Sequence, residues 1–403
     1  MAYIFPQPAS APQTPQYFQN VEKPRLINPH APKRHGMPLA GHKGVAILVA
    51  FLTLASIWLM IPFPSGAKHS DNVPFSHGSI DDYFSHFEGR QDCGIASTDL
   101  YIQPKTPITE GMTSITPPYC RNRAVLLSAL SFGGRHGFNA PFYPLGCQYR
   151  WYSTEETCMI LDRFQAVAFI GDGSLRRIYA GFNMLLRENL AMGGLEQWRM
   201  KEEERKACRC DSQVRGTECM KYTIVNSQDV RDNDSMSRHS SPYYCDRTPH
   251  IFLHLEAPFP PAPEPHIFTL SDLLAAGPPN SQKVLPIIHS LSTSPSSIPS
   301  LTSLDEFLLL ADTIAPMRPT PFLWIGPSAI NHPQQNSSQA EDGGSDEDRW
   351  HFTADMKREV YGRGVDALAM WNFTAQTSPD FGIGRSVVQA MMVVNWLARL
   401  ETV

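Results

Sequence analysis

Charged side chains are scarce in this sequence, and neither sign dominates. Asp, Glu, Lys and Arg make up 18% of the 403 residues, and the formal net charge is -5. Proteins that bind nucleic acid through a broad surface need an excess of positive charge, so the composition excludes that class of partner. The chain also has no long acidic tail and no internal repeat. Hydrophobic residues reach 42%, which is enough to bury a core.

Glycine is outnumbered by proline, with 26 residues against 35. Proline removes a backbone donor and interrupts helices, so we expect long irregular stretches. The first 43 residues contain a cluster of prolines and lack the apolar period of a helix. The sequence therefore predicts a disordered, proline-rich tail over residues 1–43.

A run without any charge follows the tail. Residues 44–61 read GVAILVAFLTLASIWLMI, and Pro62 and Pro64 end the run. About 18 residues of helix rise about 27 Å, close to the hydrocarbon thickness of early secretory membranes. We expect one transmembrane signal anchor over residues 44–62, then a stem over residues 63–90.

Cations lie mostly before this run, and acidic residues follow it. Lys33, Arg34 and Lys43 precede the span, whereas Lys68 is followed by Asp71 and two further aspartates. The positive-inside bias places the N-terminus in the cytosol and the remainder in the lumen, a type II topology. A signal peptide cleaved after Ala67 is the alternative, although its leader would be longer than an ordinary n-region.

Cysteine is absent from the first 92 residues, and an even set follows the span. An oxidising lumen would pair these thiols, but their spacing does not fix the pairing. A zinc site at Cys208, Cys210 and Cys219 is an alternative that lacks a matching second ligand pair, so no metal or other cofactor is predicted. Three sequons, at Asn233, Asn336 and Asn372, lie on the same side. The predicted disulfide cysteines are Cys93, Cys120, Cys147, Cys158, Cys208, Cys210, Cys219 and Cys245.

The lumenal part has the pattern of an α/β protein with a parallel sheet. A buried strand is expected at Ala166–Ile170, followed by a tight turn and a helical period from Leu175 to Leu190 that Gly193 ends. The folded domain is expected over residues 91–403, with irregular insertions at 256–282, 290–303 and 334–349. A last helix is expected at Ser386–Leu400. Four further short apolar runs are typical of buried parallel strands, and they lie at Ile251–Leu255, Val284–Ile288, Phe322–Ile325 and Ala367–Met370.

The strand, turn and helix around residue 171 carry a resemblance. Phe169–Tyr179 reads FIGDGSLRRIY, and it resembles the GDS block, with its following arginine, of the PC-esterase family. That family belongs to the SGNH (GDSL-like) esterases and includes plant trichome-birefringence-like proteins and fungal capsule O-acetylation proteins. Its members are often Golgi type II membrane proteins that move or remove acetyl groups on polysaccharides.

A second segment, Ser378–Arg385, is similar to the DGxH-type block that precedes the last helix in the family. Trp324–Pro327 and Trp350–Thr353 also look like fungal members. The resemblance covers roughly residues 90–403. It implies a three-layer α/β/α SGNH-hydrolase-like fold in a Golgi or ER membrane protein.

The aligned triad positions depart from the family. Gly173 stands at the nucleophilic serine, Phe381 at the aspartate and Gly384 at the histidine. None of these side chains supplies the hydroxyl, carboxylate or imidazole that ester chemistry needs, so the resemblance implies a catalytically degenerate site. The expected pocket residues are Gly171, Gly173, Arg176, Gly382 and Gly384.

Several polar residues near these motifs have two interpretations. Ser174 is either a shifted nucleophile or the helix N-cap, because it stands directly before the apolar period. Asp172 either braces the turn or takes part in catalysis, and Asp380 is either a substitute carboxylate or a turn residue. Each of three histidines is either a substitute base or an ordinary polar contact: His289, His332 and His351. Each of four tryptophans is either a platform for a sugar ring or part of the core: Trp324, Trp350, Trp371 and Trp396.

These features favour a lumenal SGNH-like protein without esterase chemistry that binds a glycan or a partner enzyme. The alternative is an active glycan O-acetyltransferase or acetylesterase that uses Ser174. A third possibility is an interaction protein that works through its proline-rich tail.

The topology can be tested on intact microsomes. We expect added protease to remove only the first ~43 residues, because the positive-inside bias leaves that segment in the cytosol. Digestion of the cysteine-bearing region in sealed microsomes would contradict the type II assignment.

Overall fold

The computed structural model describes residues 82–101, 117–135, 140–234, 243–245, 247–254, 283–290, 305, 308–309, 320–329, 346–377 and 382–401. The predicted tail and anchor, at residues 1–43 and 44–62, lie outside these ranges, as does the insertion at 256–282. No helix among the described residues combines the length and hydrophobicity needed to cross a bilayer.

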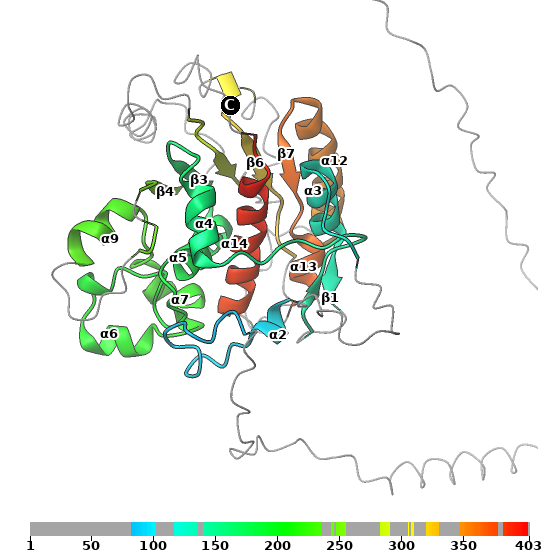
Figure 1. The fold of residues 1–403 in the computed structure, drawn as a ribbon. Helices are drawn as coiled ribbons and strands as arrows, with labels where there is room; N and C mark the ends of the chain where they lie inside the picture. The colour runs from blue at the N-terminus through cyan, green and yellow to red at the C-terminus, as the bar shows by residue number, and fades with distance from the viewer. Residues whose placement is uncertain are drawn as a thin grey trace, which may run out of the picture. The chain divides into compact units, whose positions relative to one another are not determined.

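A five-stranded parallel sheet forms the centre of the described chain (Figure 1). Neighbouring strands pair in parallel throughout, in the spatial order β4-β3-β5-β6-β7. Strand β3 lies between the next two strands of the chain, so the winding direction reverses there and creates a topological switch point. The predicted parallel α/β arrangement is confirmed. The strands are β3 (Val167–Gly171), β4 (His250–His254), β5 (Ile287–His289), β6 (Phe322–Ile325) and β7 (Asp366–Leu368).

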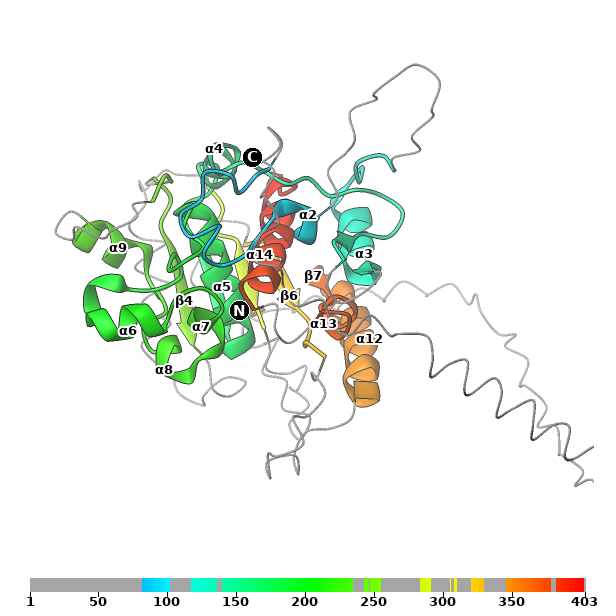
Figure 2. The same cartoon turned by 90° about the horizontal axis from the view of Figure 1, so that it is seen from below.

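Helices cover both faces of the sheet, which explains why the strands are apolar on both sides (Figures 1 and 2). On one face, β3 buries Val167 and Phe169 in the larger core cluster. On the other face, Ala168 and Ile170 pack in a cluster with Met356 of α12 (Asp346–Gly362). The larger cluster is formed with helices α3 (Arg123–Phe132), α4 (Thr154–Leu161), α5 (Gly173–Leu186) and α14 (Gly382–Ala398).

Shorter elements surround this framework. A two-stranded antiparallel ribbon pairs β1 (Gly134–Arg135) with β2 (Phe142–Tyr143). The remaining helices are α2 (Ser97–Leu100), the 3-10 turn η1 (Gln197–Arg199), α6 (Glu202–Ala207), α7 (Ser212–Arg215), α8 (Thr217–Met220), α9 (Ser227–Asp234) and α13 (Trp371–Ala375).

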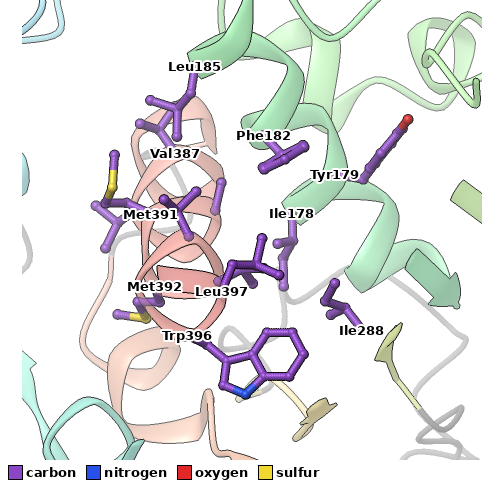
Figure 3. Close-up of a cluster of buried hydrophobic side chains, with 14 of the residues drawn as sticks. Ile178, Tyr179, Phe182, Leu185, Ile288, Val387, Met391, Met392, Trp396 and Leu397 are labelled. Carbon is purple, nitrogen blue, oxygen red and sulfur yellow. The ribbon is translucent and has the colours of Figure 1, made fainter. Parts of the chain in front are cut away.

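Helices α5 and α14 pack closely against each other (Figure 3). Ile178, Phe182 and Leu185 of α5 are buried together with Val387 and Met391 of α14. The two backbones also approach at Gly181. A Cβ atom at Gly181 would lie 2.9 Å from the Val387 nitrogen and closer still to the carbonyl of Ser386, so only glycine fits there.

The structure departs from the predicted boundaries at three points. Phe84 and Phe87 lie in the core with 0% and 4% of their surface exposed, so the folded domain begins within the predicted stem 63–90 rather than at residue 91. Helix α12 begins at Asp346, inside the insertion predicted over 334–349. Ser290, the first residue of the insertion predicted at 290–303, is buried beside the end of β5.

All eight cysteines form disulfides, as predicted, and none is free. The zinc alternative therefore has no thiolate ligand left at Cys208, Cys210 or Cys219. Four disulfides are typical of an oxidising secretory or extracellular compartment. The pairs are Cys93–Cys210, Cys120–Cys147, Cys158–Cys245 and Cys208–Cys219.

Gly181→Ala tests the close approach of α5 and α14. Alanine favours helix by up to about 1 kcal/mol, but overpacking against the backbone of α14 costs about 1–3 kcal/mol, so we expect a net loss of stability. Thermal unfolding of the purified protein should show a lower midpoint. Gly362→Ala is the matched control, because a Cβ at the last residue of α12 meets open space. Equal midpoints for both variants would contradict the packing.

Candidate functional site

The turn between β3 and α5 is held by Asp172. Its Oδ1 atom accepts from the backbone N–H groups of Ser174, at 2.9 Å, and Leu175, at 3.2 Å. Asp172 is therefore the N-cap of α5 and braces the turn, one of the two interpretations that the sequence left open. The assignment of Ser174 as N-cap is wrong, because the helix already begins at Gly173.

Ser290, beside the end of β5, forms two hydrogen bonds with the same aspartate. The Ser290 hydroxyl donates to Asp172 Oδ1 at 3.0 Å and accepts from the Asp172 N–H at 3.1 Å. A Cβ at Gly171 would lie 2.8 Å from the Ser290 carbonyl oxygen and closer to its hydroxyl, so these hydrogen bonds require glycine at position 171. The turn is thereby fixed to the neighbouring strand at the C-terminal edge of the sheet.

The N-terminus of α14 is capped by a residue distant in sequence. Asp211 Oδ1 accepts from the Ile383 N–H at 2.8 Å, and Asp211 Oδ2 lies 3.3 Å from a guanidinium nitrogen of Arg215. The preceding residue, Cys210, is bonded to Cys93. A disulfide therefore anchors the segment that supplies this cap.

A pocket of about 300 Å³ opens where the first turns of α5 and α14 come together. Ser174 and Gly382 both line it, so the first turns of the two motif-bearing helices meet there. Ser328, which follows β6, also lines it and places the pocket at the C-terminal edge of the sheet. The other lining residues are Arg177, Val214, Arg215, Thr217, Met220, Arg385, Ser386 and Gln389.

Positive charge dominates this pocket. Arg177 and Arg215 are exposed at its rim, and Arg385 is half-buried. Burial, together with the nearby charge of Arg177, lowers the pKa of Arg385 to about 10, so it stays protonated at neutral pH. Among the described residues, no imidazole and no carboxylate lines the pocket.

Polar side chains also lie in the interior of the pocket. Gln389 exposes 4% of its surface and lines the pocket with its amide group. The Ser386 hydroxyl donates to the Gly382 carbonyl at 3.2 Å and is already occupied as a donor. Gln389 and Arg385 therefore offer donors to whatever enters the pocket.

Several predicted site residues do not reach the pocket. The guanidinium of Arg176 lies 5.6 Å from the centre of the Phe252 ring, and Arg176 does not line the pocket. Gly173 and Gly384 do not line the pocket either, and Gly384 is buried within α14. Asp380, Phe381, His332 and Asn336 lie outside the described residues.

The described histidines suggested as substitute bases also lie elsewhere. His289 is buried in β5 beside Phe322, and burial lowers its pKa to about 3, so it is neutral. His351 is exposed on α12. Neither belongs to the pocket lining.

The tryptophans divide between core and surface. Trp324 and Trp396 are fully buried, as the core interpretation expected. Trp350 is 37% exposed, and its ring meets that of Trp371 edge-on with centroids 5.4 Å apart.

Two of the three sequons fall in helices. The Asn233 side-chain amide donates to the Asp229 carbonyl at 2.7 Å within α9. Half-buried Asn372 of α13 donates to the Ser131 carbonyl at 3.4 Å.

Reasoning from the sequence missed the arginines that define the pocket. Arg177 and Arg385 stand next to the predicted residues Arg176 and Gly384. A usable signal was present, because both arginines lie near the positive end of a helix dipole, where acidic residues are favoured. Arg215 carried no comparable signal, since it reaches the site through the fold of residues 208–220.

Comparisons of the chain with protein-family models, with curated proteins and with solved structures found no match.

Asp172→Ala tests the brace of the turn. Loss of an N-cap costs about 1 kcal/mol, and the Ser290 hydroxyl also loses its acceptor, so we expect unfolding free energy to fall by about 1–2 kcal/mol. Ser174→Ala is the control and should change it by less than about 0.5 kcal/mol. Asp172→Asn retains an acceptor oxygen and should recover most of the loss. Chemical denaturation measures all three, and a larger cost for Ser174→Ala would reverse the assignment of the cap.

Proposed function

We propose that this chain is a single-pass type II membrane protein of the Golgi or ER, with a lumenal SGNH/PC-esterase-like domain that binds a glycan. In this proposal the domain no longer catalyses acyl transfer. Its pocket at the sheet edge serves binding instead, either of the glycan alone or of a glycan presented by a partner enzyme.

One observation carries the proposal. The pocket contains Ser174 and Gly382 from the two motif segments, but arginines and hydroxyls surround them. A serine esterase needs an imidazole within hydrogen-bond reach of its nucleophile, and none of the described residues supplies one there. The strand order, with its switch point at β3, supports a ligand site at this edge.

The second candidate function is an active enzyme that transfers or hydrolyses acetyl esters. Ser174 lines the pocket, so it remains the one hydroxyl on the motif turn that a glycan O-acetyltransferase or acetylesterase would use. Asp172 serves this alternative poorly. Its Oδ1 already accepts from two backbone N–H groups and from the Ser290 hydroxyl, which leaves that oxygen no capacity to orient a base.

Acetyl-ester hydrolysis separates the two functions. We expect the full-length purified protein to turn over acetylated sugars at background rate, because losing a triad nucleophile or base costs about a million-fold in turnover. Ser174→Ala should leave that rate unchanged. Robust turnover that disappears in a folded Ser174→Ala protein would establish the enzyme and reject the binding function.

A further inference from the structure

The pocket offers hydrogen-bond donors and positive charge, and none of the described residues that line it is a carboxylate. Arg177 and Arg385 pair with no carboxylate among the described residues, and burial together with the charge of Arg177 disfavours the charge of Arg385. Arg215 differs from both, because Asp211 lies within ion-pair distance. Two guanidinium groups that no described carboxylate compensates are costly in one pocket unless a ligand supplies negative charge.

Backbone N–H groups at the starts of α5 and α14 are not the groups that would bind an anion in this pocket. Backbone N–H groups at the start of α5 already donate to Asp172, and the Ile383 N–H of α14 donates to Asp211. A ligand anion would therefore be held by side chains. Arginine suits that role, since its planar donors match a carboxylate, sulfate or phosphate.

The remaining lining fits something larger than a bare ion. The volume of about 300 Å³ is at the lower end of the usual range for small-molecule sites, about 300–1,000 Å³. Val214 and Met220 contribute an apolar wall, and Thr217 contributes a hydroxyl. The buried amide of Gln389 offers both a donor and an acceptor, the combination that sugar hydroxyls require.

We propose that this pocket binds an acidic sugar, with Arg385 and Arg177 holding its oxyanion and Gln389 contacting its hydroxyls. This inference rests on the proposed glycan-binding function and names the chemical class of the ligand. The shared recognition chemistry is an oxyanion on a single sugar unit, carried as a carboxylate, a sulfate ester or a phosphate ester.

A matched set of ligands tests the inference on the full-length purified protein by calorimetric titration. Glucuronate, glucose 6-sulfate and glucose 6-phosphate share one ring, and glucose is the neutral control. We expect at least one acidic sugar to bind at least tenfold more tightly than glucose, with affinity falling as salt is raised. The member that binds most tightly identifies the form of the oxyanion.

Three arginine variants locate the binding. Arg385→Gln and Arg177→Gln should each weaken the preferred acidic sugar at least about tenfold, because a charge-assisted hydrogen bond is lost. Arg177 is exposed, so its variant keeps the test valid if Arg385→Gln fails to fold. Arg176→Gln is the matched control, with the same charge change one position away, and should leave affinity within about twofold.

Three outcomes of these titrations would contradict the inference. Equal binding of glucose and the acidic sugars would reject anion recognition and leave the glycan function standing. Inorganic phosphate that binds as tightly as glucose 6-phosphate would reject the sugar. If no acidic sugar binds, the inference fails, and the fate of the proposed function is decided separately by the hydrolysis assay with Ser174→Ala.

Discussion

The contact between α5 and α14 at Gly181 determines where the site can form. Helix α5 begins at the C-terminal edge of the sheet, directly after β3. Helix α14 ends at the opposite edge, where its Trp396 side chain donates to Asp366 at the start of β7 at 2.8 Å. The two helices therefore run in the same direction, and their close packing brings both N-termini to one place. A bulkier residue at position 181 would separate the walls of the pocket.

Bringing two positive helix ends and three arginines together has an electrostatic cost. Two carboxylates offset part of it, since Asp172 caps α5 and Asp211 caps α14. The segment that contains Asp211 is held by Cys93–Cys210 and Cys208–Cys219, so its position does not depend on a large core of its own. The repulsion between Arg177 and Arg385 is not offset within the described residues, and a bound anion would relieve it and stabilise the fold.

The sheet was predictable because burial on both faces leaves uninterrupted apolar runs. Val167–Gly171 and Phe322–Ile325 lie at or within one residue of the predicted strands. Helix α5 was predictable from its period, but its start was not, and it ends at Leu186 although the apolar period continues to Leu190. Ser174 directly precedes the apolar residues, yet Asp172 can cap from two positions earlier because Gly173 and Ser174 form part of the first turn.

Contacts between residues distant in sequence could not be predicted from local sequence patterns. Phe84 and Phe87 join the core although no local period marks them, and the cysteine spacing is compatible with many pairings. The cap of α14 comes from Asp211, far away in the sequence. For the same reason Arg215 could be assigned to the arginine cluster only after the fold had brought its segment beside Arg177 and Arg385.

The two uses considered for this pocket make different demands on the same turn. Ester hydrolysis requires free donors aimed at an oxyanion that exists only in the transition state. Here the N–H groups of Ser174 and Leu175 are occupied by Asp172, so they are not available for that purpose. Arginines that hold a permanent anion bind the ground state and the transition state equally, which raises affinity without raising the rate. The occupied N–H groups of this turn therefore support the proposed binding function over the proposed esterase function.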